Sequence, residues 1–228
     1  MTAHPLDRPV WSALTNRQAD LALGDTHALR MDPDYGLFAA AADRTRQSLA
    51  ALGALTPASG ALALVEADRP PRVPGTRCEL RYIWQMTAEA LRPHAASRPD
   101  FEIVPLTEDD APQMLALATL TEPGPFFSRT HRLGDFIGVK ARGQLLAMAG
   151  ERMKPVGFTE ISGVCTHPNH RGYGYAAALT YLATQRVLER GEQPFLHVYA
   201  HNKAAIALYE ALGFSLRREM AMAVLTRA

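Results

Sequence analysis

One stretch in the second half of the chain decides its fold, and it reads Val164-Cys165-Thr166-His167-Pro168-Asn169-His170-Arg171-Gly172-Tyr173-Gly174-Tyr175-Ala176. Strand-forming residues, 159–166, lead into it, and a long apolar run, 175–189, follows its two glycines. The pattern predicts a strand, a glycine turn and a helix. The first N–H groups of such a helix have no intrahelical acceptor and lie at the positive end of the helix dipole. With glycines leaving these amides uncovered, the turn is a candidate pyrophosphate site.

Two better-known phosphate-binding motifs are excluded by the residues around the turn. The Rossmann motif needs Gly-x-Gly-x-x-Gly in a parallel unit, and the P-loop needs Gly-Lys-Ser or Gly-Lys-Thr. Here Gly174 is followed by Tyr175-Ala176-Ala177-Ala178-Leu179, and the preceding strand belongs to an antiparallel meander. An ordinary glycine turn before a helix stays open as the alternative, since short glycine motifs occur often by chance.

The flanking sequence predicts further strands and helices in alternation, as in an α/β protein. The expected strands are 101–104, 136–140, 144–153, 195–199 and 215–226. A capping-box pattern at 107–110 begins a helix that runs to about Thr119, and a second helix, 203–212, is ended by Gly213.

The first hundred residues carry no motif that identifies a function. A helix is expected at 39–52, and short strands at 61–66 and 80–86. Proline-rich breaks lie at 69–75 and 92–99, and the second is the expected domain boundary. The chain therefore divides into an N-terminal α/β segment, 1–98, and a second domain, 99–228.

The composition is that of an ordinary soluble globular protein. It is 47% hydrophobic and 21% charged, and 24 basic residues against 23 acidic ones give a net charge of +1. Nucleic acid and membrane surfaces are therefore not expected partners. The N-terminus lacks the pattern of a signal peptide, so a cytoplasmic location is expected. Cys78 and Cys165 are too far apart in sequence to suggest a disulfide framework, and reduced thiols are expected.

The glycine turn resembles the coenzyme A signature of the GNAT acetyltransferase superfamily, which reads Gln or Arg, two residues, Gly, one residue, then Gly or Ala. Residues 171–176 fit this signature, and residues 202–213 followed by Phe214 resemble the later Asn-x-x-Ala, Leu-Tyr and Leu-Gly-Phe segment of the family. The resemblance covers roughly 99–228. It implies a mixed central sheet whose two parallel strands, 159–166 and 195–199, splay apart around the coenzyme. The N-terminal segment is then a degenerate copy of that fold or a covering domain.

The resemblance also implies a function and a set of site residues. The function is transfer of an acetyl group from acetyl-CoA to an amine by direct attack in a ternary complex, with acetyl-CoA as cosubstrate and no metal. Glu160 is the candidate base, acting through water, and Tyr209 meets the coenzyme sulfur. The coenzyme-binding residues are Val164, Thr166, Arg171, Gly172, Tyr173, Gly174, Tyr175, Ala176 and Asn202.

Several alternatives to these roles stay open at the level of the sequence. Asn202 is equally a helix N-cap, Glu160 a solvated strand carboxylate, and His197 an alternative base. The whole protein is alternatively a noncatalytic acyl-CoA sensor or a structural subunit of an acetylating complex. The acceptor is a small-molecule or peptide amine, and a homodimer is compatible with the sequence.

Overall fold

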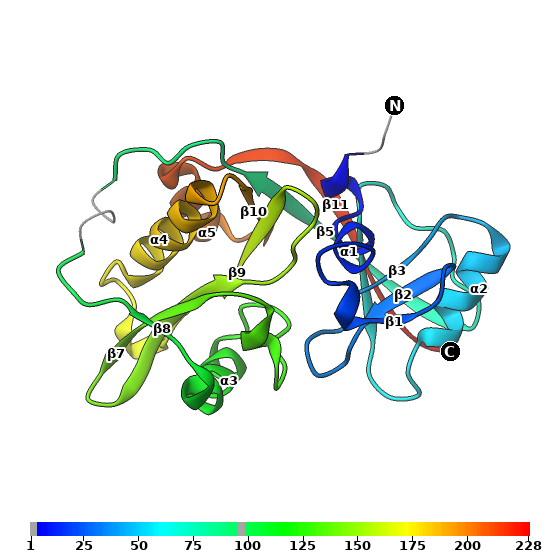
Figure 1. Ribbon diagram of the computed structural model, residues 1–228, viewed down its shortest axis with the longest axis horizontal. Coiled ribbons are helices and arrows are strands. Elements are labelled where there is room, and N and C mark those ends of the chain that lie inside the picture. Colours follow the sequence, from blue (N-terminus) through cyan, green and yellow to red (C-terminus); the bar gives the residue numbers. More distant parts are fainter. Residues whose placement is uncertain (1–3, 95–98) are drawn as a thin grey trace.

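The computed structural model describes residues 4–94 and 99–228 and is built on one large mixed sheet (Figure 1). Its strands lie in the order β4-β11-β5-β10-β9-β8-β7-β6. In chain order they are β4 (Leu62–Glu66), β5 (Thr76–Thr87), β6 (Val104–Pro105), β7 (Phe136–Ala141), β8 (Gln144–Glu151), β9 (Phe158–Thr166), β10 (Gln193–Tyr199) and β11 (Ser215–Arg227). Within the described residues, β9 and β10 are the one parallel pair of this sheet. The mixed α/β sheet expected from the sequence is confirmed.

Helices cover both faces of the C-terminal half of the sheet (Figure 1). They are α3 (Ala111–Thr121), α4 (Tyr175–Glu189) and α5 (Lys203–Leu212). Helix α3 packs with Met148 of β8, whereas α4 and α5 pack with its neighbours Ala147 and Ala149. Because successive residues of a strand point to opposite faces, the two groups of helices enclose the sheet from opposite sides.

The N-terminal segment contributes to the large sheet and also forms a smaller one. Its further elements are α1 (Pro9–Leu14), β1 (Ala22–Gly24), β2 (Ala28–Met31), β3 (Ala39–Ala41) and α2 (Arg46–Leu55), and β1-β2-β3 form an antiparallel sheet. Strand β5 pairs with β10 on one side and with β11 on the other. The large sheet thus contains strands from both sides of residue 98. The division of the chain at that position stays a prediction.

Most of the expected elements lie where the sequence predicts them, with two clear differences, whereas α1, β1 and β2 are not predicted. The helix expected at 39–52 begins only at Arg46, after the Thr45 N-cap, because 39–41 pair with β2 as strand β3. The strand expected at 101–104 shrinks to Val104–Pro105. In both places pairing with neighbouring strands decides the conformation, and local propensity does not.

Strand β9 contains a bulge that changes which side chains share a face. The register against β8 shifts between Met148 and Gly150, and Gly163 on β9 has φ of +64°. As a result Val164 packs on the α4 side with Ile161, while Cys165 packs on the α3 side. Simple alternation would place Glu160, Ser162 and Val164 on one face; the extra residue of the bulge moves Val164 to the other.

Candidate active site

The splayed ends of β9 and β10 open into a large cavity of about 970 Å³. The two strands pair only at the start, from Gln193 with Phe158 to Phe195 with Glu160. Beyond that point β9 remains bonded to β8, and β10 remains bonded to β5. The facing edges of residues 161–166 and 196–199 are therefore free to accept an extended ligand between them.

The glycine turn lies at one end of this cavity and has the geometry of an anion site. Gly174 occupies the N-cap of α4 with φ of +77°, a left-handed conformation that glycine adopts at little cost. The first intrahelical bond runs from the N–H of Ala178 to the carbonyl of Gly174. Within the described residues, the N–H groups of 175–177 have no acceptor, and a Cβ added at Gly174 would meet nothing within 4 Å. The turn thus presents uncovered amides to open space at the positive end of a helix.

The structure brings nearly all the predicted coenzyme-binding residues to this cavity. Those that line it are Val164, Thr166, Arg171, Gly172, Gly174, Tyr175, Ala176 and Asn202. Tyr173 lies outside the lining, 64% exposed, with its ring stacked on that of Tyr175. Asn202 also caps α5, because its side-chain oxygen accepts a hydrogen bond from the N–H of Ala205 at 3.2 Å. Its two predicted roles are therefore compatible in one position.

Comparison with known proteins identifies the family that shares this fold. A GNAT-family protein of known structure from Novosphingobium aromaticivorans DSM 12444 shares 44% identity with the chain, covers 99% of it and 100% of itself, and superposes with a TM-score of 0.89. The chain belongs to the GNAT acetyltransferase family. The model of the FR47-like family matches residues 137–223 of this GNAT chain. No curated protein matched it.

More distant solved structures share the fold of this GNAT protein. A GCN5-related N-acetyltransferase from Kribbella flavida superposes with a TM-score of 0.69 at 18% identity, over 99% of this chain and 97% of the other. A GCN5-related N-acetyltransferase-like protein from Streptococcus suis 89/1591 gives a TM-score of 0.59 at 17% identity, over 95% and 92% of the two chains. These likenesses include the N-terminal segment, so the fold extends over both halves of the chain.

Tyr209 projects from α5 into the cavity between the splayed strands. Its side chain is buried, and within the described residues no hydrogen bond engages its hydroxyl group. Burial raises the pKa of Tyr209 to about 12. The phenol is therefore neutral at physiological pH and carries a proton that it can donate in a hydrogen bond.

Glu160, the candidate base, is fully buried and does not line the cavity. Its Oε2 and Oε1 accept hydrogen bonds from Nε and Nη2 of Arg152 at 2.9 and 2.8 Å, and Oε1 also lies 2.8 Å from Nδ1 of His197. Burial by itself raises the pKa of Glu160, but the charge of Arg152 and the hydrogen bonds from His197 and Arg152 outweigh it. The pKa is held well below its usual range. Glu160 is thus ionised at neutral pH and poorly suited to take a proton directly.

Glu160 does not reach the cavity, but its two partners form part of the cavity wall. His197 and Arg152 both line the cavity, and His197 Nε2 lies 3.1 Å from Nε2 of the buried Gln85. The guanidinium of Arg152 lies over the ring of Phe38, 4.8 Å from its centroid. Phe38 and Gln85 come from the N-terminal segment, which therefore helps to build the site.

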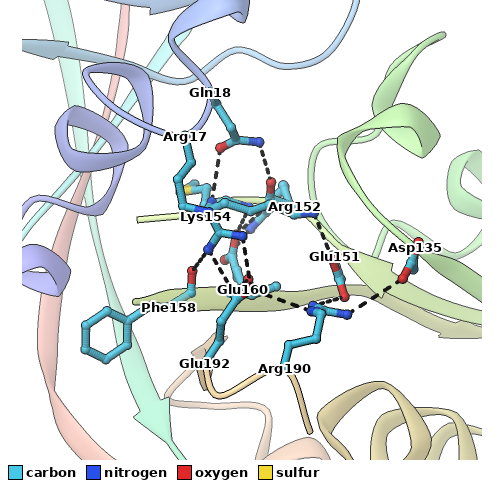
Figure 2. Close-up of polar contacts among 12 residues, drawn as sticks. Arg17, Gln18, Asp135, Glu151, Arg152, Lys154, Phe158, Glu160, Arg190 and Glu192 are labelled. Atoms are coloured by element: carbon cyan, nitrogen blue, oxygen red, sulfur yellow. Dashed lines mark hydrogen bonds and ion pairs between the residues drawn. The ribbon is translucent and has the colours of Figure 1, made fainter. Parts of the chain in front are cut away.

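Hydrogen bonds from the N-terminal segment fix the backbone around Arg152 (Figure 2). Gln18 donates from Nε2 to the Arg152 carbonyl at 2.8 Å and accepts from the N–H of Lys154 at 3.0 Å. Next to this contact, the buried carboxylate of Glu151 bridges Lys154 and Arg190. The segment from Glu151 to Lys154 is held from both sides, so the direction of the Arg152 side chain is well defined.

The remaining candidate groups are placed as follows. Burial raises the pKa of the Cys165 thiol to about 11, which makes it a poor nucleophile, and Cys78 is exposed.

Among residues 4–94 and 99–228, no group of three or more His, Cys, Asp or Glu side chains is arranged to hold a metal ion. None of the helices in those ranges has the length and apolar character to cross a membrane. A smaller cavity of about 250 Å³ lies in the N-terminal half, and no predicted site residue lines it.

Sequence reasoning missed six residues that line the large cavity. They are Phe38, Val65, Arg81, Ile83, Arg152 and Met222. Most of them come from the first hundred residues or from strands paired with that segment, where no motif marks them. Arg152 and Met222 lie within predicted strands of the second domain, and the position of Arg152 next to Glu160 depends on the pairing of β8 with β9.

Proposed function

We propose that this GNAT protein is an N-acetyltransferase that transfers the acetyl group of acetyl-CoA to an amine by direct attack in a ternary complex. One observation carries the proposal: a single cavity joins uncovered helix N-terminal amides to the gap between β9 and β10. The amides suit a pyrophosphate, and the free strand edges suit the amide groups of the pantetheine arm. A volume of about 970 Å³ is large for a ligand site, and it leaves room for an acceptor beside the thioester.

The proposed reaction needs no covalent enzyme intermediate. The neutral amine attacks the thioester carbonyl, an N–C bond forms, and the C–S bond breaks with its electron pair passing to sulfur. An acceptor that starts as an ammonium ion loses one proton before the attack and a second one as the amide forms, and the thiolate gains one proton. Acetyl-CoA and a protonated amine thus give an amide, a free thiol and one released proton. The high pKa of the Cys165 thiol fits a direct transfer, because a thiol that is not ionised is a poor relay for the acetyl group.

Tyr209 is the proposed donor to the leaving sulfur. Its neutral phenol lines the cavity near the splayed strands, where the sulfur of an arm threaded between them would lie. A phenol with a pKa of about 12 stabilises a thiolate by hydrogen bonding and gives up its proton less readily than an ordinary tyrosine. The proton that completes the thiol then comes from water.

We infer that Glu160 acts through Arg152 and His197 and does not take the ammonium proton itself. A carboxyl at its ordinary pKa of about 4.3 is already roughly 3.5 units below an α-ammonium group, which corresponds to about 5 kcal/mol, and Glu160 lies lower still. An α-ammonium group with a pKa of about 8 is roughly one tenth neutral at pH 7, so the amine can lose its proton to bulk solvent before it attacks. Glu160 is then a positioning residue, and the base role through water that the sequence suggests is not part of this proposal.

Calorimetric titration with acetyl-CoA followed by a thiol-release assay against a panel of amines tests the proposal. Micromolar binding together with amine-dependent thiol release is the expected result. Binding without product from any amine would assign the protein to the noncatalytic sensors, and the absence of binding would refute the coenzyme site itself.

A further inference from the structure

Part of the cavity wall is formed by the N-terminal segment and its neighbours, and we call this part of the cavity the chamber. Four apolar side chains, those of Phe38, Val65, Ile83 and Met222, line this chamber. All four belong to one packed cluster between α1 and the large sheet. An acceptor that enters the chamber therefore meets a preformed apolar surface.

Arg152 is the most buried cation in the walls of the chamber. Its side chain is 11% exposed, and Glu160 occupies its Nε and Nη2. Within residues 4–94 and 99–228, nothing accepts a hydrogen bond from Nη1, which lies 3.7 Å from the position of a Cβ added at Gly124. Gly124 also lines the cavity, so this nitrogen faces the chamber with its donors unused.

The charges around the chamber have one predominant sign. The cations of the cavity wall are Arg81, Arg152 and Arg171, whereas Glu122 is its one carboxylate among the described residues. Arg171 lies at the phosphate turn, and Arg81 and Arg152 lie on the acceptor side. Arg81 is turned partly to solvent and paired with Glu79, which leaves Arg152 as the cation best placed to hold an anionic group.

We propose that the acceptor is an amine carrying a carboxylate and an apolar side chain, as in a hydrophobic amino acid, with the carboxylate on Nη1 of Arg152. The proposal rests on the acetyltransferase function above and adds the chemical class of its acceptor. Glu160 fixes the guanidinium in place through two bonds, and Phe38 stacks beneath it. A cation held in this way loses little freedom when it binds a carboxylate.

Matched acceptor pairs test this proposal on the unmodified protein. The pairs are L-phenylalanine against 2-phenylethylamine and L-leucine against 3-methylbutylamine, with L-phenylalaninamide as an uncharged analogue. Rates are compared per concentration of neutral amine, because loss of the carboxylate changes the pKa of the amine. A buried charge-assisted hydrogen bond predicts kcat/KM about 10-fold to 100-fold higher for the amino acids. Equal or higher values for the decarboxylated amines would overturn the proposal and leave the acetyltransferase function intact.

Two variants assign the preference to Arg152. In Arg152→Lys the pair with Glu160 keeps its charges but the free Nη1 is lost, so the preference should fall at least about 10-fold while acetyl-CoA affinity stays unchanged. Arg190→Lys is the control, because Arg190 is also ion-paired yet does not line the cavity. If Arg152→Lys does not fold, the neutral pair R152Q/E160Q replaces it. A preference for amino acids that survives in the Arg152 variant would refute the assignment.

The binding of acceptors separates failure of this inference from failure of the proposed function. If no amine is acetylated, titration with L-phenylalanine and with 2-phenylethylamine in the presence of coenzyme A decides the matter. Binding of the amino acid alone supports the carboxylate site in a noncatalytic protein. Equal binding of the two ligands, or binding of neither, contradicts it.

Discussion

Replacing Glu160 by Gln tests the buried ion pair that organises the site. Glu160→Gln keeps the shape of the side chain but leaves the guanidinium of Arg152 buried without its counter-charge (Figure 2). Removing one partner of a buried pair costs about 3–5 kcal/mol of unfolding free energy. At roughly 2–4 °C per kcal/mol for a chain of this size, the unfolding midpoint should fall by about 6–20 °C.

Differential scanning calorimetry and urea unfolding measure this loss, and Glu79→Gln is the matched control. Glu79 pairs with Arg81 at 2.8 Å, the same distance as in the Arg152–Glu160 pair, but both of its side chains are exposed. Because exposed pairs contribute little, this variant should unfold at the wild-type temperature. A Glu160→Gln shift no larger than that of Glu79→Gln would refute the argument that burial makes the Arg152 pair important.

The pH dependence of the same variant follows from the lowered pKa of Glu160. A depressed pKa in the folded state gives stability that is present above the unfolded value of about 4.3 and is lost as pH falls through the lower folded value. The difference in stability between wild type and Glu160→Gln should therefore be constant from pH 5 to 8 and shrink below about pH 4. Urea midpoints across this range measure it, and a difference that vanishes near pH 6 would contradict the assigned pKa direction.

Three further outcomes are expected. Gly174→Ala should weaken acetyl-CoA binding at least about 10-fold, as measured by calorimetry. Its control is Gly143→Ala at a hairpin turn, where φ is nearly the same (+78° against +77°); this variant should suffer a similar backbone strain of about 1–2 kcal/mol but bind acetyl-CoA as the wild type does. Equal binding by both variants would argue against the phosphate turn. Tyr209→Phe should lower kcat about 10-fold or more with little change in the KM for acetyl-CoA, because the lost hydrogen bond acts on the leaving sulfur, and a raised KM alone would show a binding role instead. If water accepts the ammonium proton, the apparent pKa of kcat/KM should follow the pKa of each acceptor amine, and a fixed value for all amines would reveal a base in the protein.

Helices α4 and α5 could be predicted to the residue because their signals are local. Helices α4 and α5 begin and end where the glycine turns, the Asn202 cap and Gly213 place them. Each signal acts within one turn of the chain, so no knowledge of the fold is needed. The cavity lining by Arg171, Gly172, Gly174, Tyr175 and Ala176 follows from the same local geometry.

What the sequence could not predict depends on pairing between distant strands. The bulge at Gly163 is invisible in a run of strand-forming residues, and it changes the face on which Val164 lies. Burial of Glu160 depends on Arg152, His197 and the N-terminal cover, none of which is adjacent in sequence. A residue can therefore be predicted in the right strand while its pKa, and with it its chemical role, stays out of reach.

The position of β5 has a consequence for the order in which the sheet forms during synthesis. Strand β5 ends at Thr87, yet its two neighbours in the sheet begin at Gln193 and Ser215. On the ribosome this strand must wait with both edges unpaired until β10 has emerged, and with one edge unpaired until β11 has emerged. The central sheet therefore closes only after β11 has been synthesised. Truncation of β11 should leave a chain in which β5 has lost a whole edge and is prone to pair with other chains.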